Sequence, residues 1–232
     1  MMLLVGLMAG FVGVAAEPRS GDIVVKIEPA KITRRTFDPQ NPPKEMPKLT
    51  PPEVGTCVYS FGCTTEVMMR GTRGRPARLS RVEVAARLTI TLWTPQKGPP
   101  KILAHEEAHR AICEIYYERA DLIARELAER EIGRQISASI RDKALAELEL
   151  KKIQNALIAE FMRETAGRCD FAQARFDAIT EHSMNPIDES EAIALAIAEE
   201  QTAYARLNPA RTDEVATRSS ISPRFPPTRP RS

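Results

Sequence analysis

The chain has 232 residues, of which 43% are hydrophobic, 28% are charged and 5% are aromatic. Its formal net charge of +2 is close to balanced, so the composition as a whole argues against a nucleic-acid-binding protein. Aromatic residues are scarce, so the core must be built mainly from Ala, Leu, Ile and Val, which favours helices.

The first sixteen residues predict a signal peptide. They carry no charged side chain and end in Val14-Ala15-Ala16, a small-residue pattern that favours cleavage after Ala16. The apolar run is shorter than the roughly 20 residues that cross a bilayer, so no stable membrane anchor is expected. We therefore expect a secreted or periplasmic protein with one folded domain, 17–208.

Three segments predict the strands of a small sheet. Residues 22–33 alternate apolar and polar side chains, and residues 56–70 are rich in β-branched and aromatic residues. Residues 81–94 show the clearest alternation, with their apolar side chains at even positions. Six prolines in residues 38–52 predict an extended surface connection between the first two segments.

Residues 101–168 predict helices, because almost every residue there favours a helix and proline is absent. A single rod of this length would approach roughly 100 Å, so the chain must fold back on itself. Gly133 and residues 137–139 are the candidate turns of an antiparallel helical hairpin. Further helices are predicted at residues 170–183 and 187–207.

The order of these elements predicts an α+β fold in which a small, mostly antiparallel sheet packs on long helices. Residues 209–232 are rich in Pro, Arg, Ser and Thr and show no hydrophobic period. This composition predicts a disordered basic tail.

The first predicted helix contains the motif H-E-x-x-H, as His105-Glu106-Glu107-Ala108-His109. Positions i and i+4 lie on one face of a helix, so His105 and His109 can both bind one zinc ion. A carboxylate beside the zinc-bound water can accept its proton, and Glu106 fits this role of general base. Both histidines also lie on the apolar face of the helix, which argues against the alternative of a solvated helix face.

A catalytic zinc usually takes three protein ligands and a water molecule. The chain has only three histidines, and the third, His182, follows His109 by 73 residues. The predicted hairpin must therefore return the chain for His182 to reach the ion. The alternative is a glutamate ligand from the helical stretch between them. The candidates there are Glu126, Glu129, Glu160 and Glu164.

Three pieces of the chain bear on this choice: the strand 88–93, the H-E-x-x-H helix, and Phe176-Asp177-Ala178-Ile179-Thr180-Glu181-His182. In this order they resemble a family of bacterial proteins predicted to be secreted zinc-dependent proteases, long carried as a domain of unknown function. The last piece is similar to an aromatic-Asp-x-x-Thr-x-His-Gly pattern, with Ser183 at the glycine position. The resemblance covers roughly residues 20–185 and implies a zincin-like metalloprotease. It favours His182 as the third zinc ligand, with Asp177 and Thr180 donating or accepting hydrogen bonds around it.

These observations predict a secreted zinc-dependent metallopeptidase that acts on a protein or peptide substrate. Residues 81–93 are a candidate sheet edge to which a substrate strand adds. Tyr116 and Tyr117 are candidates for stabilising the oxyanion, with core positions as the alternative. Two other functions stay open: a non-catalytic exported helical protein with a structural metal, and an envelope interaction protein that uses its basic tail.

Four cysteines in an exported chain predict two disulfide bonds, for which three pairings are possible. The favoured pairs are Cys57 with Cys63 and Cys113 with Cys169. The second bond would tie the zinc-binding helix to the helix that carries His182.

Overall fold

The computed structural model describes residues 22–71, 76–137 and 143–208. The predicted signal peptide, 1–16, and the predicted basic tail, 209–232, lie outside the described residues. Within them, the strands precede all of the helices and form one sheet. This arrangement confirms the α+β class, whereas the zincin-like architecture stays a prediction.

The sheet is built around one long central strand. The strands are β1 (Asp22–Ile27), β2 (Lys31–Phe37), β3 (Thr56–Arg70) and β4 (Arg78–Pro95). β1 pairs with the first half of β4 and β2 with the second half, both in parallel. β3 pairs with the other side of β4 in antiparallel fashion. The sheet is therefore mixed, which corrects the expectation of a mostly antiparallel sheet.

The parallel pairing arises because β1 and β2 are two parts of one extended stretch. The predicted strand 22–33 is interrupted at Pro29, which has no N–H for the ladder. β1 ends opposite Ala86 and β2 begins opposite Thr89, so the chain keeps its direction along one edge of β4. The proline-rich connection, 38–55, then crosses the end of β4 and brings β3 to its other side.

β4 cannot be the free edge that was predicted for residues 81–93, because it is paired on both sides. Among the described residues, β3 pairs with β4 alone and therefore forms an edge of the sheet. A substrate strand would have to add to β3 instead.

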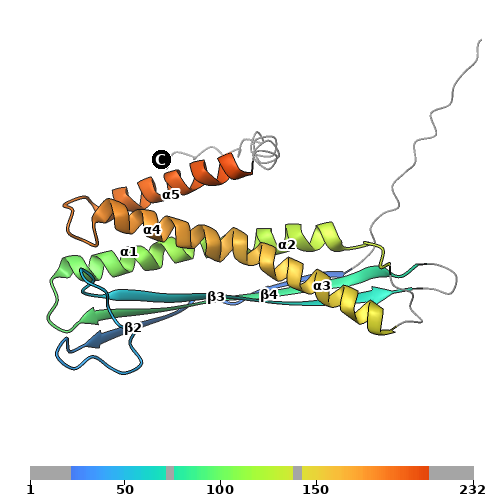
Figure 1. Ribbon diagram of the computed structural model, residues 1–232, viewed down its shortest axis with the longest axis horizontal. Coiled ribbons are helices and arrows are strands. Elements are labelled where there is room, and N and C mark those ends of the chain that lie inside the picture. The colour runs from blue at the N-terminus through green and yellow to red at the C-terminus, as the bar shows by residue number, and fades with distance from the viewer. Residues whose placement is uncertain (1–21, 72–75, 138–142, 209–232) are drawn as a thin grey trace, which may run out of the picture.

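The helices all lie on one face of the sheet (Figure 1). α1 and α2 lie along this face, α3 packs on β3, α4 packs on α1, and α5 packs on α4 and α1. Gly133, which follows α2, has a φ of 77° and begins the predicted reversal of the chain. The helices are α1 (Pro100–Tyr117), α2 (Ala120–Glu131), α3 (Lys143–Met162), the π-helical turn η1 (Arg163–Gly167), α4 (Arg168–Thr180) and α5 (Glu189–Leu207).

The core lies between the sheet and the helical layer. The even positions of β4 face this core, as the alternation predicted, and the odd positions face the other side of the sheet. No helix in the described ranges is both long and apolar enough to cross a membrane. The predicted inward residues of β4 are each at most 1% exposed: Val82, Val84, Leu88, Ile90 and Leu92.

Candidate metal centre

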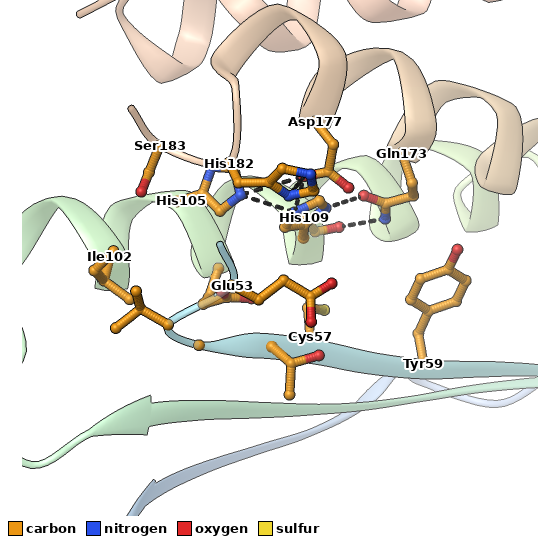
Figure 2. A pocket seen from close by; sticks show the side chains of 14 residues that line it. Glu53, Cys57, Tyr59, Ile102, His105, His109, Gln173, Asp177, His182 and Ser183 are labelled. Carbon is orange, nitrogen blue, oxygen red and sulfur yellow. Dashed lines mark hydrogen bonds and ion pairs between the residues drawn. The ribbon is translucent and has the colours of Figure 1, made fainter. Parts of the chain in front are cut away.

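α1 places His105 and His109 side by side, one helical turn apart, on the face that packs against α4. The helix begins after Gly98-Pro99, and Pro100 occupies its first turn, where a proline costs no hydrogen bond. The Nε2 atoms of the two imidazoles are 3.2 Å apart. His105 is 5% exposed and the side chain of His109 is 12% exposed. The spacing in the motif thus produces the predicted pair of converging nitrogens (Figure 2).

Asp177 of α4 completes a compact group of three ligand atoms. Its Oδ1 atom lies 3.3 Å from Nε2 of His105 and 3.0 Å from Nε2 of His109. Three ligands at about 2.0–2.1 Å from one tetrahedral ion would be separated by about 3.3–3.4 Å. His105, His109 and Asp177 could therefore hold a metal ion. From the sequence, Asp177 was expected only to form hydrogen bonds around the third ligand.

Two polar atoms of this group, Nδ1 of His105 and Oδ1 of Asp177, have no hydrogen-bond partner among the described residues. Among the described residues, Oδ1 of Asp177 is buried and has no well-aligned hydrogen-bond donor. Burial alone would raise the pKa of Asp177, but the imidazoles of His105 and His109 hold it well below its usual range. A buried carboxylate oxygen without a well-aligned donor is costly unless a cation is bound there.

His182 lies beside this group and outside it. Its Nδ1 atom is 3.6 Å from Oδ1 of Asp177, and its side chain is 37% exposed. His182 lines the same cavity as the three converging ligands (Figure 2). Its role as a zinc ligand therefore stays a prediction, and the compact group of possible ligands contains Asp177 but not His182. The glutamates considered as alternatives, Glu126, Glu129, Glu160 and Glu164, do not line the cavity that the described residues enclose.

The backbone around His182 is unusual, because three consecutive residues other than glycine have positive φ angles. These angles are 49° at Glu181, 52° at His182 and 71° at Ser183. Left-handed conformations cost such residues about 1–2 kcal/mol each. Ser183 stands where the similar pattern has glycine, the residue that adopts this backbone without strain. The turn ends α4 sharply and brings His182 back over Asp177.

The imidazole of His109 is held by a hydrogen bond at its other nitrogen. Nδ1 of His109 is hydrogen-bonded to Oε1 of Gln173 on α4. A partner of this kind orients a metal-binding histidine so that the remaining nitrogen faces the ion. Nδ1 of His105 lies 3.8 Å from Oε2 of Glu189 at the start of α5, which is too far for a hydrogen bond. The sequence reasoning missed both residues, although Gln173 precedes Asp177 by one helical turn and therefore shares its face.

Glu106 is buried at the floor of the site, with 3% exposure. Burial raises the pKa of its carboxyl group to about 7, and the nearby Asp177 and Glu53 add to the effect while His109 opposes it. Gly55 makes room for this carboxylate, because a Cβ atom there would lie 2.8 Å from Oε1 of Glu106. The group can therefore exchange a proton near neutral pH, as a general base must.

Glu107 has a different environment from its neighbour. It forms ion pairs with Arg34 of β2 and with Arg110, and the bond from Arg34 lowers the pKa of its carboxyl group. These contacts tie α1 to the sheet on the side away from the cavity. The structure thus separates a buried, unpaired Glu106 from a paired Glu107.

The site opens into a cavity of about 190 Å³ between the start of β3, α1 and α4. Tyr116 and Tyr117 do not line it. The hydroxyl of Tyr116 donates to Glu200, and that of Tyr117 donates to the carbonyl oxygens of Glu28 and Ala86. Both tyrosines are core residues, so their proposed oxyanion role was wrong. The cavity is lined by Glu53, Val54, Gly55, Thr56, Cys57, Tyr59, Ile102, His105, Glu106, His109, Gln173, Asp177, His182 and Ser183.

The four cysteines are free thiols in the structure. The predicted bond between Cys57 and Cys63 was wrong, because both lie on the continuous strand β3. Six residues of a strand span roughly 20 Å, whereas a disulfide needs Cα atoms within about 7 Å. The sulfur atoms of Cys113 and Cys169 are in contact at 3.8 Å. Hydrogen bonds from Cys169 and Cys57 lower the pKa of the Cys113 thiol to about 5.

No family model, curated protein or solved structure matches this chain. The family resemblance noted in the sequence therefore stays a prediction. The function has to be inferred from the chemistry of the site itself.

Proposed function

We propose that this protein is a secreted or periplasmic zinc-dependent metallopeptidase. In this proposal His105, His109 and Asp177 bind the zinc ion, and Glu106 acts as the general base. The observation that carries it is the convergence of three ligand atoms within 3.3 Å of one another, beside a buried carboxylate of the same helix. The adjoining cavity leaves room for water and substrate.

The donor set selects a transition metal. Two imidazole nitrogens and one carboxylate oxygen suit Zn²⁺ or Fe²⁺, whereas Mg²⁺ and Ca²⁺ prefer ligand sets made of oxygen alone. Glu106 favours zinc, because a base with a pKa near 7 has a use in hydrolysis. Among the described residues the compact group has three ligands, whereas a structural zinc usually has four protein ligands, and this argues against a purely structural metal.

The residues divide the chemistry as follows. When bound, zinc supplies a Lewis acid that polarises a carbonyl group and lowers the pKa of water. Glu106 accepts the proton of the attacking water and returns it to the leaving amide nitrogen. Gln173 keeps the imidazole of His109 oriented towards Asp177, and Glu189 lies 3.8 Å from Nδ1 of His105.

The open edge of β3 supports a peptide as substrate. In the antiparallel ladder, alternate residues direct their backbone N–H and C=O groups away from β4. The backbone carbonyl of Thr65 accepts a hydrogen bond from Gln154 and therefore does not bond to β4. By the alternation of the ladder, the odd-numbered residues before Met68 direct their backbone N–H and C=O groups away from β4. Cys57 and Tyr59 belong to this set and also line the cavity. An extended peptide can therefore add to β3 beside the metal ligands.

The test combines metal analysis with a pair of neighbouring variants. The purified mature chain should contain about one zinc per chain by mass spectrometry of metals, and should cleave members of a peptide library. Glu106→Gln should keep both metal and fold but lose hydrolysis by about 10²-fold or more. Glu107→Gln is the matched control and should keep most of the activity, because its contacts lie on the surface.

Two outcomes would overturn the proposal. One is equal loss of activity in Glu106→Gln and Glu107→Gln, which would remove the special role of Glu106. The other is a zinc-loaded wild type that cleaves no peptide yet unfolds when the metal is chelated, which would favour the non-catalytic alternative with a structural metal. Iron in place of zinc would point to redox chemistry at the same three ligands.

A further inference from the structure

Three of the four cysteines meet in the core from three different elements. Cys57 comes from β3, Cys113 from α1 and Cys169 from α4. Cys113 is the central one, because its sulfur lies 3.8 Å from that of Cys169 and accepts a hydrogen bond from Gln173, which lines the same cavity as Cys57. Cys113 and Cys169 are 0% exposed, whereas Cys57 is partly exposed and lines the cavity of the metal centre.

The side chain of Gln173 joins this thiol cluster to the metal centre. Its Nε2 atom donates to the sulfur of Cys113 at 3.1 Å and lies 3.7 Å from the sulfur of Cys169. The same amide group donates to the backbone oxygen of His109 at 2.9 Å and bonds Nδ1 of its ring. A new bond between the two sulfurs would therefore change the hydrogen bonds of the Gln173 amide, which orients the predicted metal ligand His109.

We propose that Cys57, Cys113 and Cys169 form a thiol relay that ends in a disulfide bond between α1 and α4. Cys57 is the entry point, because it alone of the three reaches the cavity. The Cys113 and Cys169 sulfurs need only close from 3.8 Å to a bonded distance of about 2.05 Å, which side-chain rotation can supply. The resulting bond ties the helix of His105 and His109 to the helix of Asp177.

The exchange steps balance with a small disulfide of two monothiols, such as oxidised glutathione, as the oxidant. The neighbouring Cys113 and burial raise the pKa of the Cys57 thiol, so only a small fraction of Cys57 is thiolate at any time. This thiolate attacks the small disulfide, forms a mixed disulfide and releases one small thiol. Cys113 then attacks the sulfur of Cys57 and releases the second small thiol. Cys169 attacks the sulfur of Cys113, and Cys57 leaves as a thiol. The net change is two protein thiols oxidised to one disulfide and one small disulfide reduced to two thiols.

The test follows the oxidation of the reduced full-length chain by oxidised glutathione, with peptide mapping by mass spectrometry. A glutathione adduct on Cys57 should appear first, followed by a peptide cross-linked through Cys113 and Cys169. Cys57→Ser should slow formation of this cross-link by about tenfold or more, because the buried pair loses its entry thiol. Cys63→Ser is the matched control on the same strand and should leave the rate unchanged.

The cross-link should also raise the melting temperature by about 5 °C or more, since it closes a loop of more than fifty residues. An adduct that forms first on Cys63, or no cross-link between Cys113 and Cys169 after complete oxidation, would overturn the proposal. An unchanged rate in Cys57→Ser would do the same. If this variant does not fold, the order of adducts in the wild type still decides. The experiment needs neither substrate nor metal, so its outcome is independent of the proposed peptidase activity.

Discussion

The assignment of Asp177 as the third metal ligand can be tested with Asp177→Asn. This change keeps the shape of the side chain but removes the charge whose Oδ1 atom lies 3.0 Å and 3.3 Å from the two imidazole nitrogens. Tetrahedral zinc sites in small domains bind with about 10–16 kcal/mol shared among four ligands, so one ligand contributes roughly 2.5–4 kcal/mol. The amide oxygen of Asn retains part of this binding free energy, so we expect the loss at the lower end of the range. About 2.5 kcal/mol corresponds to a loss of zinc affinity of about 100-fold.

The assay is competition for zinc between the protein and a chromophoric chelator, with circular dichroism to confirm the fold. His182→Ala is the decisive comparison, because this side chain is 37% exposed and approaches Asp177 without joining the compact group. It should weaken zinc binding by no more than about tenfold, as for residues that only support a ligand. Asp121→Asn, an exposed position on α2, should have no effect. The reasoning is refuted if Asp177→Asn binds zinc like the wild type while His182→Ala loses affinity by orders of magnitude.

Two further predictions concern residues that support the site. Gly55→Ala should reduce peptide hydrolysis by about tenfold or more while zinc stays bound, because the new Cβ atom would lie 2.8 Å from Oε1 of Glu106 and 2.9 Å from the backbone oxygen of Trp93, so that the carboxylate has to move. Gly62→Ala, whose Cβ would meet only the flexible Arg87 side chain, is the control, and equal losses in kcat would contradict this explanation. Glu200→Gln should destabilise the fold by about 2–4 kcal/mol, since it leaves the guanidinium of Arg168 without the buried carboxylate with which it pairs. Denaturant unfolding measures this change, and a loss below about 1 kcal/mol would show that the pair contributes little.

Local periodicity accounts for the features that the sequence predicted correctly. The spacing of His105 and His109 decides their common direction as soon as the segment is helical, because one turn of helix separates them. The inward face of β4 follows in the same way from the alternation of its side chains. The separation of Glu106 from Glu107 also needs only the helical rotation of about 100° per residue.

Partners that lie far apart in the chain were decided by the tertiary structure. The packing of α4 on α1 brings Asp177 to the two imidazoles, and the left-handed turn at residues 181–183 places His182 beside it. Glu189 arrives from a separate helix, so no spacing in the sequence connects it to His105. The parallel pairing of β1 and β2 likewise depends on which side of β4 the chain follows.

For the cysteines, too, the sequence predicted one feature and the tertiary structure decided another. Their number predicted pairing, and the contact between Cys113 and Cys169 agrees with one predicted partner choice. The distance between Cys57 and Cys63 was decided by the continuity of β3, because an uninterrupted strand carries the two sulfurs apart where a hairpin would have brought them together. Sequence patterns report the direction of a side chain within its own element, whereas the packing of elements against one another determines which side chains meet.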